Sequence, residues 1–262
     1  MAYNMSATRM LATSMPWISA AALRASLFKL LHPLQQKFEC PICGYEGPFR
    51  NVAPPTGIRT HAKCARCGAL ERHRLQCLVI EQLLSKINPA TMRMLHFAPE
   101  RFFEERFRSL FRRYETADIA MPGVDHHVDL QALPFESGSY DIVYASHVLE
   151  HIRNDHAAIA EIRRILAPGG LAILPVPIVS PTTIEYPEPN PFETMHVRAP
   201  GTDYFDRFKL HFARIDLYSS ELFQSRYQLF SYEDRSVTRP MTPLRVPMPG
   251  NRHPDVVPVC FA

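Results

Sequence analysis

Residues 140–175 constrain the fold of this chain more strongly than any other part of its sequence. They begin with a short apolar run at 141–145, with β-branched members, which predicts a buried strand of a parallel sheet. Apolar residues then recur with a helical period over 154–166, and a Pro-Gly-Gly sequence at 168–170 ends the predicted helix. A second apolar strand follows at 171–176. Two parallel strands joined by a helix predict an α/β fold with a right-handed crossover and helices on both faces of the sheet.

Length and composition allow one domain of ordinary size and a small additional module. The chain has 262 residues, of which 46% are hydrophobic and 21% charged, so it can bury a sizeable core and is not of the disordered class. Its 24 prolines, about twice the usual share, cluster at 175–200 and 240–258 and predict extended loops there. Residues 1–74 carry ten Lys and Arg against three acids (+7), and the remainder carries 19 against 23 (−4). The first third is therefore expected to meet an anionic rather than a cationic partner.

Two Cys-x-x-Cys pairs form the second strong pattern. Each pair is followed by glycine, and 20 residues separate the pairs, which comprise Cys40, Cys43, Cys64 and Cys67. This spacing is typical of a structural zinc site, because two tight turns bring four sulfurs to the corners of a tetrahedron. Four thiolates leave no open coordination position, so the predicted Zn²⁺ stabilises the fold and performs no chemistry. Disulfides are the alternative, and the paired turns argue against them. Cys77 and Cys260 lie outside the pattern and are expected to be buried apolar residues.

The segments LPFESGSYDIVYASHVLEHI (133–152) and EIRRILAPGGLAIL (161–174) resemble class I S-adenosylmethionine-dependent methyltransferases of the type 11 branch. They match the fourth strand, the helix after it and the turn into the fifth strand of that family, and the resemblance covers residues 90–180. It implies a doubly wound, Rossmann-like sheet of seven strands, methyl transfer from S-adenosylmethionine and a cytoplasmic location. Another nucleotide ligand on the same fold is the alternative.

The first strand of that sheet, predicted at 92–97, ends in a turn that departs from the family pattern. The family has a glycine-rich GxGxG turn here, whereas this chain has none, and its turn comprises His96, Phe97, Ala98, Pro99 and Glu100. The turn resembles a sub-branch of zinc-knuckle methyltransferases with LHxAPE at this place and GxLERHR upstream, here at 68–74. Ala98 is small and Pro99 suits the start of a helix, so the five residues are predicted to bind the cofactor. A degenerate pocket without cofactor is the alternative.

The resemblance assigns further cofactor contacts to the ends of the following strands. Asp118 ends a strand predicted at 114–117, with Ile119 beside it, and is placed to accept hydrogen bonds from both ribose hydroxyls. An aspartate that only caps a turn is the alternative. Asp129 and Leu130 match the family position where an acidic side chain meets the adenine amino group. Two residues that follow the strand at 141–145 complete the predicted cofactor site, Ser146 and His147.

His147 is the first candidate catalytic residue. It lies where ligands bind in such folds, at the carboxyl edge of the sheet, and is predicted to face the cofactor sulfonium or the acceptor. Glu150 and His151 share its face if the turn that contains them is helical. A histidine with a pKa near neutral suits removal of a proton from the acceptor. A purely structural histidine is the alternative.

His196 is the second candidate catalytic residue. With Arg198 it opens a segment, 196–204, that resembles the HVRxYGxDY element of the same sub-branch. Both side chains are predicted to bind the acceptor, and Arg198 suits a carboxylate or phosphate. They belong to a proline-rich loop, 177–200, whose position over the strand ends predicts a substrate lid.

The first 38 residues contain no acid and predict an amphipathic helix at 18–32. Its apolar stripe comprises Leu23, Leu27, Leu30, Leu31 and Leu34. Docking of the stripe on the protein is favoured over a peripheral membrane anchor or a targeting segment, and no run is long enough to span a bilayer. The chain is thus divided into the helix region, a zinc ribbon at 39–70 and a methyltransferase domain at 71–262 with a proline-rich insertion at 233–255.

Basic residues between and after the cysteine pairs raise RNA as a partner. They are Arg50, Arg59, Lys63, Arg66, Arg72, His73 and Arg74. In the same region only Tyr45 and Phe49 offer aromatic rings that could stack on bases. A solvated basic surface without RNA is therefore an equally good interpretation. The acceptor is a small molecule, a sugar or lipid precursor, or RNA, since the fold alone does not select among them. The competing function is a noncatalytic zinc-ribbon binding protein.

Overall fold

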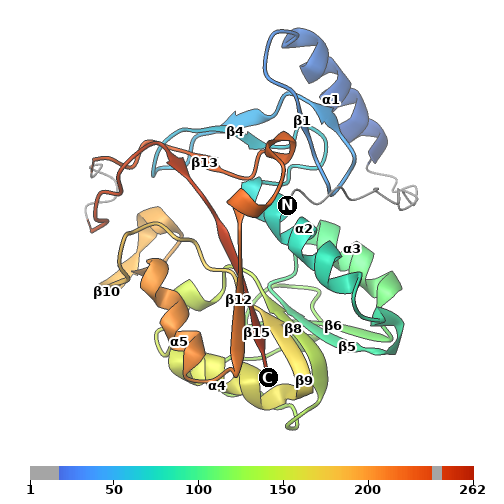
Figure 1. Cartoon of the computed structure of the whole chain (residues 1–262), viewed down its shortest axis with the longest axis vertical. Helices are drawn as coiled ribbons and strands as arrows, with labels where there is room; N and C mark the ends of the chain where they lie inside the picture. The colour runs from blue at the N-terminus through green and yellow to red at the C-terminus, as the bar shows by residue number, and fades with distance from the viewer. Residues whose placement is uncertain (1–17, 238–243) are drawn as a thin grey trace.

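A mixed sheet of seven strands forms the body of the protein in the computed structural model, which describes residues 18–237 and 244–262 (Figure 1). From one edge to the other the strands are β12 (Arg214–Ser219), β15 (Val256–Phe261), β9 (Leu166–Ile173), β8 (Tyr140–Ala145), β5 (Arg93–Phe97), β6 (Arg113–Asp118) and β7 (His126–His127). The five strands from β9 to β7 are parallel, and β15 runs antiparallel between β12 and β9. This arrangement confirms the predicted doubly wound sheet.

Helices cover both faces of the sheet, as predicted. The helices α2 (Glu71–Leu84) and α3 (Arg101–Leu110) pack on one face, and α4 (Asp155–Ile165) and α5 (Asp206–Lys209) on the other (Figure 1). Along β5 the side chains alternate between two hydrophobic cores, because successive residues of a strand point to opposite faces. Met94 faces the core under α2 and α3, and Leu95 and Phe97 face the core under α4.

The central βαβ unit follows the predicted pattern closely. Asn154 caps α4 by accepting a hydrogen bond from the amide of Ala157 at 3.2 Å. The next strand begins earlier than expected, at Leu166, and passes through the Pro-Gly-Gly sequence with a shift in its register. A Cβ on Gly170 would lie 2.9 Å from the carbonyl oxygens of Ala167 and Asp141, so only glycine fits this turn.

A small ribbon lies at one end of the sheet and combines residues from both ends of the chain (Figure 1). Its strands form a two-stranded sheet, β1 (Phe38–Glu39) and β2 (Glu46–Gly47), and a four-stranded sheet in the order β14 (Arg252–His253), β13 (Ser231–Tyr232), β4 (Arg59–Lys63) and β3 (Arg50–Val52). The segment 233–255, for which the sequence predicts no regular structure, thus begins beside β13 and contains β14. The C-terminal part of the chain completes the sheet of the ribbon.

The helix α1 (Ile18–Leu31) forms where the sequence predicts it, but it docks through a different face. Ala21 and Ala25 are buried, and Ala25 packs with Phe28 into the core of the ribbon. The prediction that the leucine stripe docks is wrong, since the five leucines are between 54% and 99% exposed: Leu23, Leu27, Leu30, Leu31 and Leu34. Small residues let the helix approach the aromatic core of the ribbon closely, which the leucines would prevent. Among the described helices, none has the length and apolar character needed to cross a membrane.

The predicted lid loop at 177–200 contains a β-hairpin, which corrects the expectation of an extended loop. Its strands are β10 (Ile184–Asn190) and β11 (His196–Ala199). Six single turns of 3₁₀ helix complete the described elements: η1 (Pro89–Thr91), η2 (Leu149–His151), η3 (Pro191–Glu193), η4 (Thr202–Phe205), η5 (Ser220–Leu222) and η6 (Ser225–Tyr227).

One buried arginine on α2, Arg74, joins the ribbon to the body of the protein. Its guanidinium donates to the carbonyl oxygens of Ala62 and Ala69 in the ribbon, both at 2.9 Å. It also donates to the carbonyl oxygens of Tyr227 and Gln228, at 2.9 and 2.6 Å. One side chain therefore joins the ribbon and α2 to a segment about 150 residues later in the chain.

Replacement of Arg74 by methionine should strongly destabilise the whole protein. The change leaves buried carbonyl oxygens without donors, each at a cost of about 1–3 kcal/mol, so we expect the free energy of unfolding to fall by about 3–5 kcal/mol. Denaturant unfolding followed by circular dichroism measures the change. The control is Lys63→Met, at an exposed position of β4, which should shift stability by about 0.5 kcal/mol or less. Equal stabilities of the two variants would contradict this role of Arg74.

Candidate functional site

The carboxyl ends of β5, β6 and β8 meet at one edge of the sheet and bring predicted cofactor residues together. β5 lies between the other two strands, and Phe97 is in register with Ala117 of β6 and with Ala145 of β8. The chain continues from β5 to β6 on one side and returns to β8 on the other, which makes this edge a topological switch point where ligands bind in open α/β sheets. We call this edge of the sheet, where the three strands end, the crevice edge.

Ala98 takes the conformation that glycine takes in the family turn. Its φ is +48°, in the left-handed region that L-residues other than Gly, Asn and Asp rarely adopt. Its amide donates to the carbonyl oxygen of Ala117 at 3.0 Å, which holds the turn on the neighbouring strand. Pro99 and Glu100 then lead into α3, with Glu100 as the N-cap residue. The turn therefore includes a left-handed residue, although it contains no glycine.

The side chains of His96 and Phe97 point into the two cores and away from the crevice edge. His96 is fully buried, with Nδ1 2.8 Å from the Tyr114 hydroxyl and Nε2 3.3 Å from Glu100 Oε2, and its ring stacks on Tyr144. Phe97 is 2% exposed and belongs to the core under α4. Only the backbone of these two residues can contact a ligand, and Phe97 does not obstruct the site.

Asp118 lies at the end of β6, as predicted, and also caps the turn after it. Its Oδ1 accepts hydrogen bonds from the amides of Ala120 and Met121, both at 2.8 Å. Oδ2 has no partner within the described part of the chain and is available to a ligand. The neighbouring Ile119 is 70% exposed, so its side chain is accessible to a ligand.

Asp129 and Leu130 form the next part of the predicted cofactor site. Asp129 is exposed and accepts a hydrogen bond from the backbone amide of Gln131 at 2.9 Å and two more from its side-chain amide, both at 3.2 Å. Leu130 is buried in the core under α4. The Gln131 side chain thus engages both carboxylate oxygens of Asp129, while Leu130 supports the loop.

The N-terminal turns of α2 reach the end of β8, a contact that the sequence alone did not reveal. Gln76 is fully buried and its Oε1 accepts hydrogen bonds from the hydroxyls of Tyr144 and Ser146, at 2.6 and 3.2 Å. His73 accepts the amide of Leu70 at 3.1 Å, and burial lowers its pKa well below the usual value. The only sequence signal was the GxLERHR segment, which the resemblance connects with the Ala98 turn.

Several basic residues considered as RNA contacts are engaged within the protein. Arg59 forms an ion pair with buried Glu71 at 2.8 Å, Arg66 donates to the carbonyl oxygen of Cys43 at 3.1 Å, and Arg74 is fully buried. Lys63 is exposed. RNA binding stays a prediction, and fewer Arg and Lys side chains are available for it than the sequence indicates.

His147 follows β8 and faces an acidic neighbour. Its φ is +55°, and its amide donates to the carbonyl oxygen of Pro175 at 2.9 Å. Nδ1 lies 3.2 Å from Oε1 of Glu150, which belongs to the 3₁₀ turn η2. Burial, reinforced by the charge of Arg72, lowers the pKa of His147 to about 3. The imidazole is therefore neutral at pH 7.

His196 and Arg198 point toward the turn η2 from strand β11. Arg198 is 1% exposed and donates to the carbonyl oxygens of Leu149, Ile152 and Arg153, at 2.7, 2.6 and 2.9 Å. The prediction that Arg198 binds the acceptor is wrong, because these bonds occupy its guanidinium. Burial lowers the pKa of His196 to about 4, against the opposing effect of Glu150.

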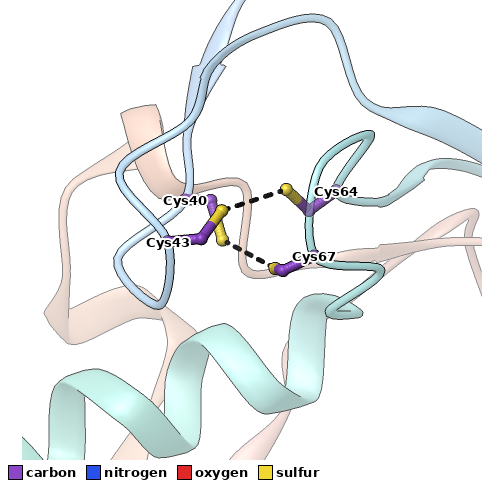
Figure 2. A group of neighbouring side chains, drawn as sticks. All are labelled: Cys40, Cys43, Cys64 and Cys67. Carbon is purple, nitrogen blue, oxygen red and sulfur yellow. Dashed lines mark hydrogen bonds between the residues drawn. The ribbon is translucent and has the colours of Figure 1, made fainter. Parts of the chain in front are cut away.

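The four cysteines of the ribbon converge as predicted, with sulfur atoms facing one another across two turns (Figure 2). Cys40 Sγ lies 3.6 Å from Cys67 Sγ, and Cys43 Sγ lies 3.7 Å from Cys64 Sγ. A tetrahedral zinc ion with bonds of about 2.3 Å requires sulfur–sulfur distances of about 3.8 Å. The two turns are alike: Gly44 and Gly68 each have positive φ and donate to the carbonyl oxygen of the first cysteine. The donor set and its spacing fit Zn²⁺.

Comparison with known proteins identifies one segment of the chain. Residues 103–174 match the family model described as "Methyltransferase domain". A segment of 69 residues is 38% identical to an uncharacterized 37.1 kDa protein in transposon TN4556 of Streptomyces fradiae, covering 26% of this chain and 20% of that protein. A segment of 72 residues is 38% identical to a polyketide synthase-nonribosomal peptide synthetase of Pyricularia grisea, covering 28% of this chain and 2% of that protein. The chain thus matches only a fifth or less of the length of these relatives.

The structure is also similar to that of an S-adenosylmethionine-dependent methyltransferase from Mesorhizobium loti. The TM-score is 0.48 at 11% sequence identity, over 72% of this chain and 98% of that one. The family model spans α4, most of α3 and the strands β6 to β9, which include two of the three strand ends at the crevice edge. Residues 103–174 thus match a methyltransferase domain in sequence, in the region where the resemblance was expected.

Proposed function

We propose that the protein transfers a methyl group from S-adenosylmethionine to an acceptor held at the crevice edge. The observation that carries this proposal is the convergence of Ala98, Asp118 and His147 at the ends of three neighbouring strands, within and beside the matched methyltransferase region. The sulfonium of the cofactor supplies the electrophile, so the main task of the protein is to align donor and acceptor.

The residues at the crevice edge fit the parts of the cofactor. The free Oδ2 of Asp118 suits the ribose hydroxyls, and the exposed side chain of Ile119 suits the flat face of adenine. The left-handed turn at Ala98 lets the backbone approach the methionine end, close to the N-terminus of α3, which favours a carboxylate. Asp129 suits the adenine amino group once Gln131 releases it.

His147 and His196 stay the candidate residues on the acceptor side. Burial depresses both pKa values, to about 3 and about 4, so both rings are neutral and only weakly basic at pH 7. Such rings suit the positioning of an acceptor by hydrogen bonds more than the removal of a proton from a poor nucleophile. The acceptor classes stay those of a small molecule, a sugar or lipid precursor, or RNA.

Binding of S-adenosylhomocysteine should depend on the negative charge of Asp118. Asp118→Asn keeps an oxygen for the amides of Ala120 and Met121 but loses the carboxylate that we assign to the ribose. We expect its affinity in calorimetry to fall at least about tenfold, since a hydrogen bond to a charged group contributes about 1.5–3 kcal/mol. Asp118→Ala should lose the turn as well and bind more weakly still.

Asp216→Asn, at an exposed position of β12, is the matched control and should bind like the wild type. If Asp118→Asn binds as tightly as the control, Asp118 is a turn residue only. If the wild type shows no binding, the noncatalytic alternative is supported and the proposed function is lost.

The turn at Ala98 should tolerate glycine and reject a β-branched residue. Ala98→Gly removes the strain of φ +48°, which costs the folded state about 1–2 kcal/mol. Glycine also raises the entropy of the unfolded chain, which opposes this gain. The free energy of unfolding should therefore change little, and ligand binding should be kept. Ala98→Val places a branched side chain in the left-handed region and should weaken binding of S-adenosylhomocysteine at least about tenfold. Equal affinities of the two variants would show that this turn does not contact the ligand.

We infer that the ribbon binds one structural Zn²⁺ through Cys40, Cys43, Cys64 and Cys67. The closed tetrahedral donor set and the matching geometry of the two turns support this inference. Because Arg74 joins the ribbon to α2 and to the C-terminal segment, the metal is expected to stabilise the whole described fold.

Loss of the ribbon zinc should lower the melting temperature of the entire protein. We expect one zinc per chain that survives dialysis against citrate, and its loss in Cys64→Ser together with a drop in Tm of about 10 °C. Elemental analysis and thermal unfolding measure the two effects. Cys260→Ala, at a buried cysteine outside the cluster, should keep the zinc. Retention of zinc in Cys64→Ser would refute the assignment.

A further inference from the structure

A second cluster of potential metal ligands lies beyond the end of β8, apart from the ribbon. It consists of Glu150, His151 and His196, whose ligand atoms all lie within 4.8 Å of one another. The rings of His151 and His196 are nearly perpendicular, at 87°, with centroids 4.8 Å apart. His196 Nε2 lies 4.0 Å from Glu150 Oε1. Side chains from two separate elements, η2 and β11, thus converge on one point.

Several polar atoms in and beside this cluster are buried without hydrogen bonds. Glu150 is fully buried, and neither of its carboxylate oxygens has a hydrogen-bond partner within the described residues. His147 Nδ1 lies 3.2 Å from Oε1 but lacks the alignment of a hydrogen bond. Nδ1 of His196 and Nε2 of His147 are also buried without partners. Unpaired buried polar groups are costly, and a cation between them removes that cost at the carboxylate.

The chain holds this cluster in place by contacts that do not use its ligands. Arg198 follows His196 by two residues on β11, so both side chains point to the same side of the strand. Its guanidinium donates to the carbonyl oxygens of Leu149 and Ile152, on either side of Glu150 and His151. The strand that carries His196 is thereby fixed against the turn that carries the other two ligands. Such support from outside the ligand set is what a preorganised site requires.

We propose that Glu150, His151 and His196 bind one divalent transition-metal ion. Two imidazoles and one carboxylate form a donor set suited to Zn²⁺, Fe²⁺ or Co²⁺. His147 is not among the three ligands, but its Nδ1 lies 3.2 Å from Oε1 of Glu150. From there its ring N–H can orient the ligating carboxylate once the metal is bound. Three protein ligands leave at least one coordination position open, in contrast to the ribbon. His151 is exposed, which gives the metal a path of entry.

The open position narrows the class of acceptor, a step that rests on the proposed function. His147 connects the cluster to the end of β8, where we place the reactive end of the cofactor. A divalent metal there can accept a hydroxyl oxygen of the acceptor at its open position, and coordination lowers the pKa of that hydroxyl. The acceptor class is accordingly a molecule that presents a hydroxyl group to the metal.

Titration of the full-length protein with Co²⁺ tests the metal site without turnover. The ribbon is first loaded with Zn²⁺, and dialysis against citrate removes weakly bound Zn²⁺ until one zinc per chain remains, so that the second cluster is empty. Binding of Co²⁺ is then followed by calorimetry and visible absorbance. The wild type should take up one Co²⁺ with the weak bands of nitrogen and oxygen ligation and without sulfur-to-cobalt charge transfer. Glu150→Gln and His196→Ala should each weaken this binding at least about tenfold.

His156→Ala is the matched control, since His156 is an exposed histidine of α4 outside the cluster. Glu150→Gln keeps the size of the side chain, so its fold should survive, and circular dichroism verifies this. Co²⁺ should raise the melting temperature of the wild type and of His156→Ala but not of Glu150→Gln.

The proposal is overturned if the zinc-loaded wild type takes up no Co²⁺, or if Glu150→Gln binds Co²⁺ as tightly as His156→Ala does. Binding of S-adenosylhomocysteine is measured on the same samples in the absence of Co²⁺. Failure of the metal site and failure of the proposed methyl transfer are therefore separate results.

Discussion

Two buried arginines hold the additions to the sheet in place, one on each addition. Arg74 ties the ribbon and the C-terminal segment to α2, and Arg198 ties the hairpin to the turn η2. A guanidinium has five donors in a planar fork and stays charged, so one side chain can pair with several carbonyl oxygens from distant segments. Burial of that charge is tolerated because the oxygens around it satisfy its donors. The ribbon and the hairpin are thus fixed relative to the strand ends where the ligands are expected.

The sheet could be predicted from the sequence because each of its main strands carries a local signal. The apolar run before His147, the helical period after it and the Pro-Gly-Gly turn depend only on neighbouring residues. The ribbon sheet could not be predicted, because β13 and β14 are two residues long and β13 pairs with β4, about 170 positions earlier. The hairpin β10–β11 was hidden by its prolines, which indicate an irregular loop. For α1 the position of the helix was predicted correctly. Which of its faces docks depends on the surface of the ribbon, and that surface cannot be read from the sequence of the helix.

The candidate site was predictable in position more than in detail. The places of Asp118 and His147 follow from strand ends and from the family resemblance. What each side chain does there is set by tertiary contacts: His96 turns into a core, and Gln76 arrives from another helix. Glu150 lies on a predicted face, yet its missing hydrogen bonds become visible only once His196 is placed against it. Spacing along the chain carries no information about such pairs.

The ribbon influences the position of the crevice edge through α2 and not through direct contact with a ligand. Only Gly68 and Ala69 separate the last cysteine, Cys67, from the N-cap residue of that helix. One turn further on, Arg74 is fixed by the ribbon carbonyls, and Gln76 fixes the hydroxyl of Ser146 at the end of β8. Rotation of α2 by a fraction of a turn would break both contacts at once, because Arg74 and Gln76 lie only two residues apart on the helix. The metal that we propose for the ribbon would therefore determine where a strand end of the candidate site lies, without performing any chemistry of its own.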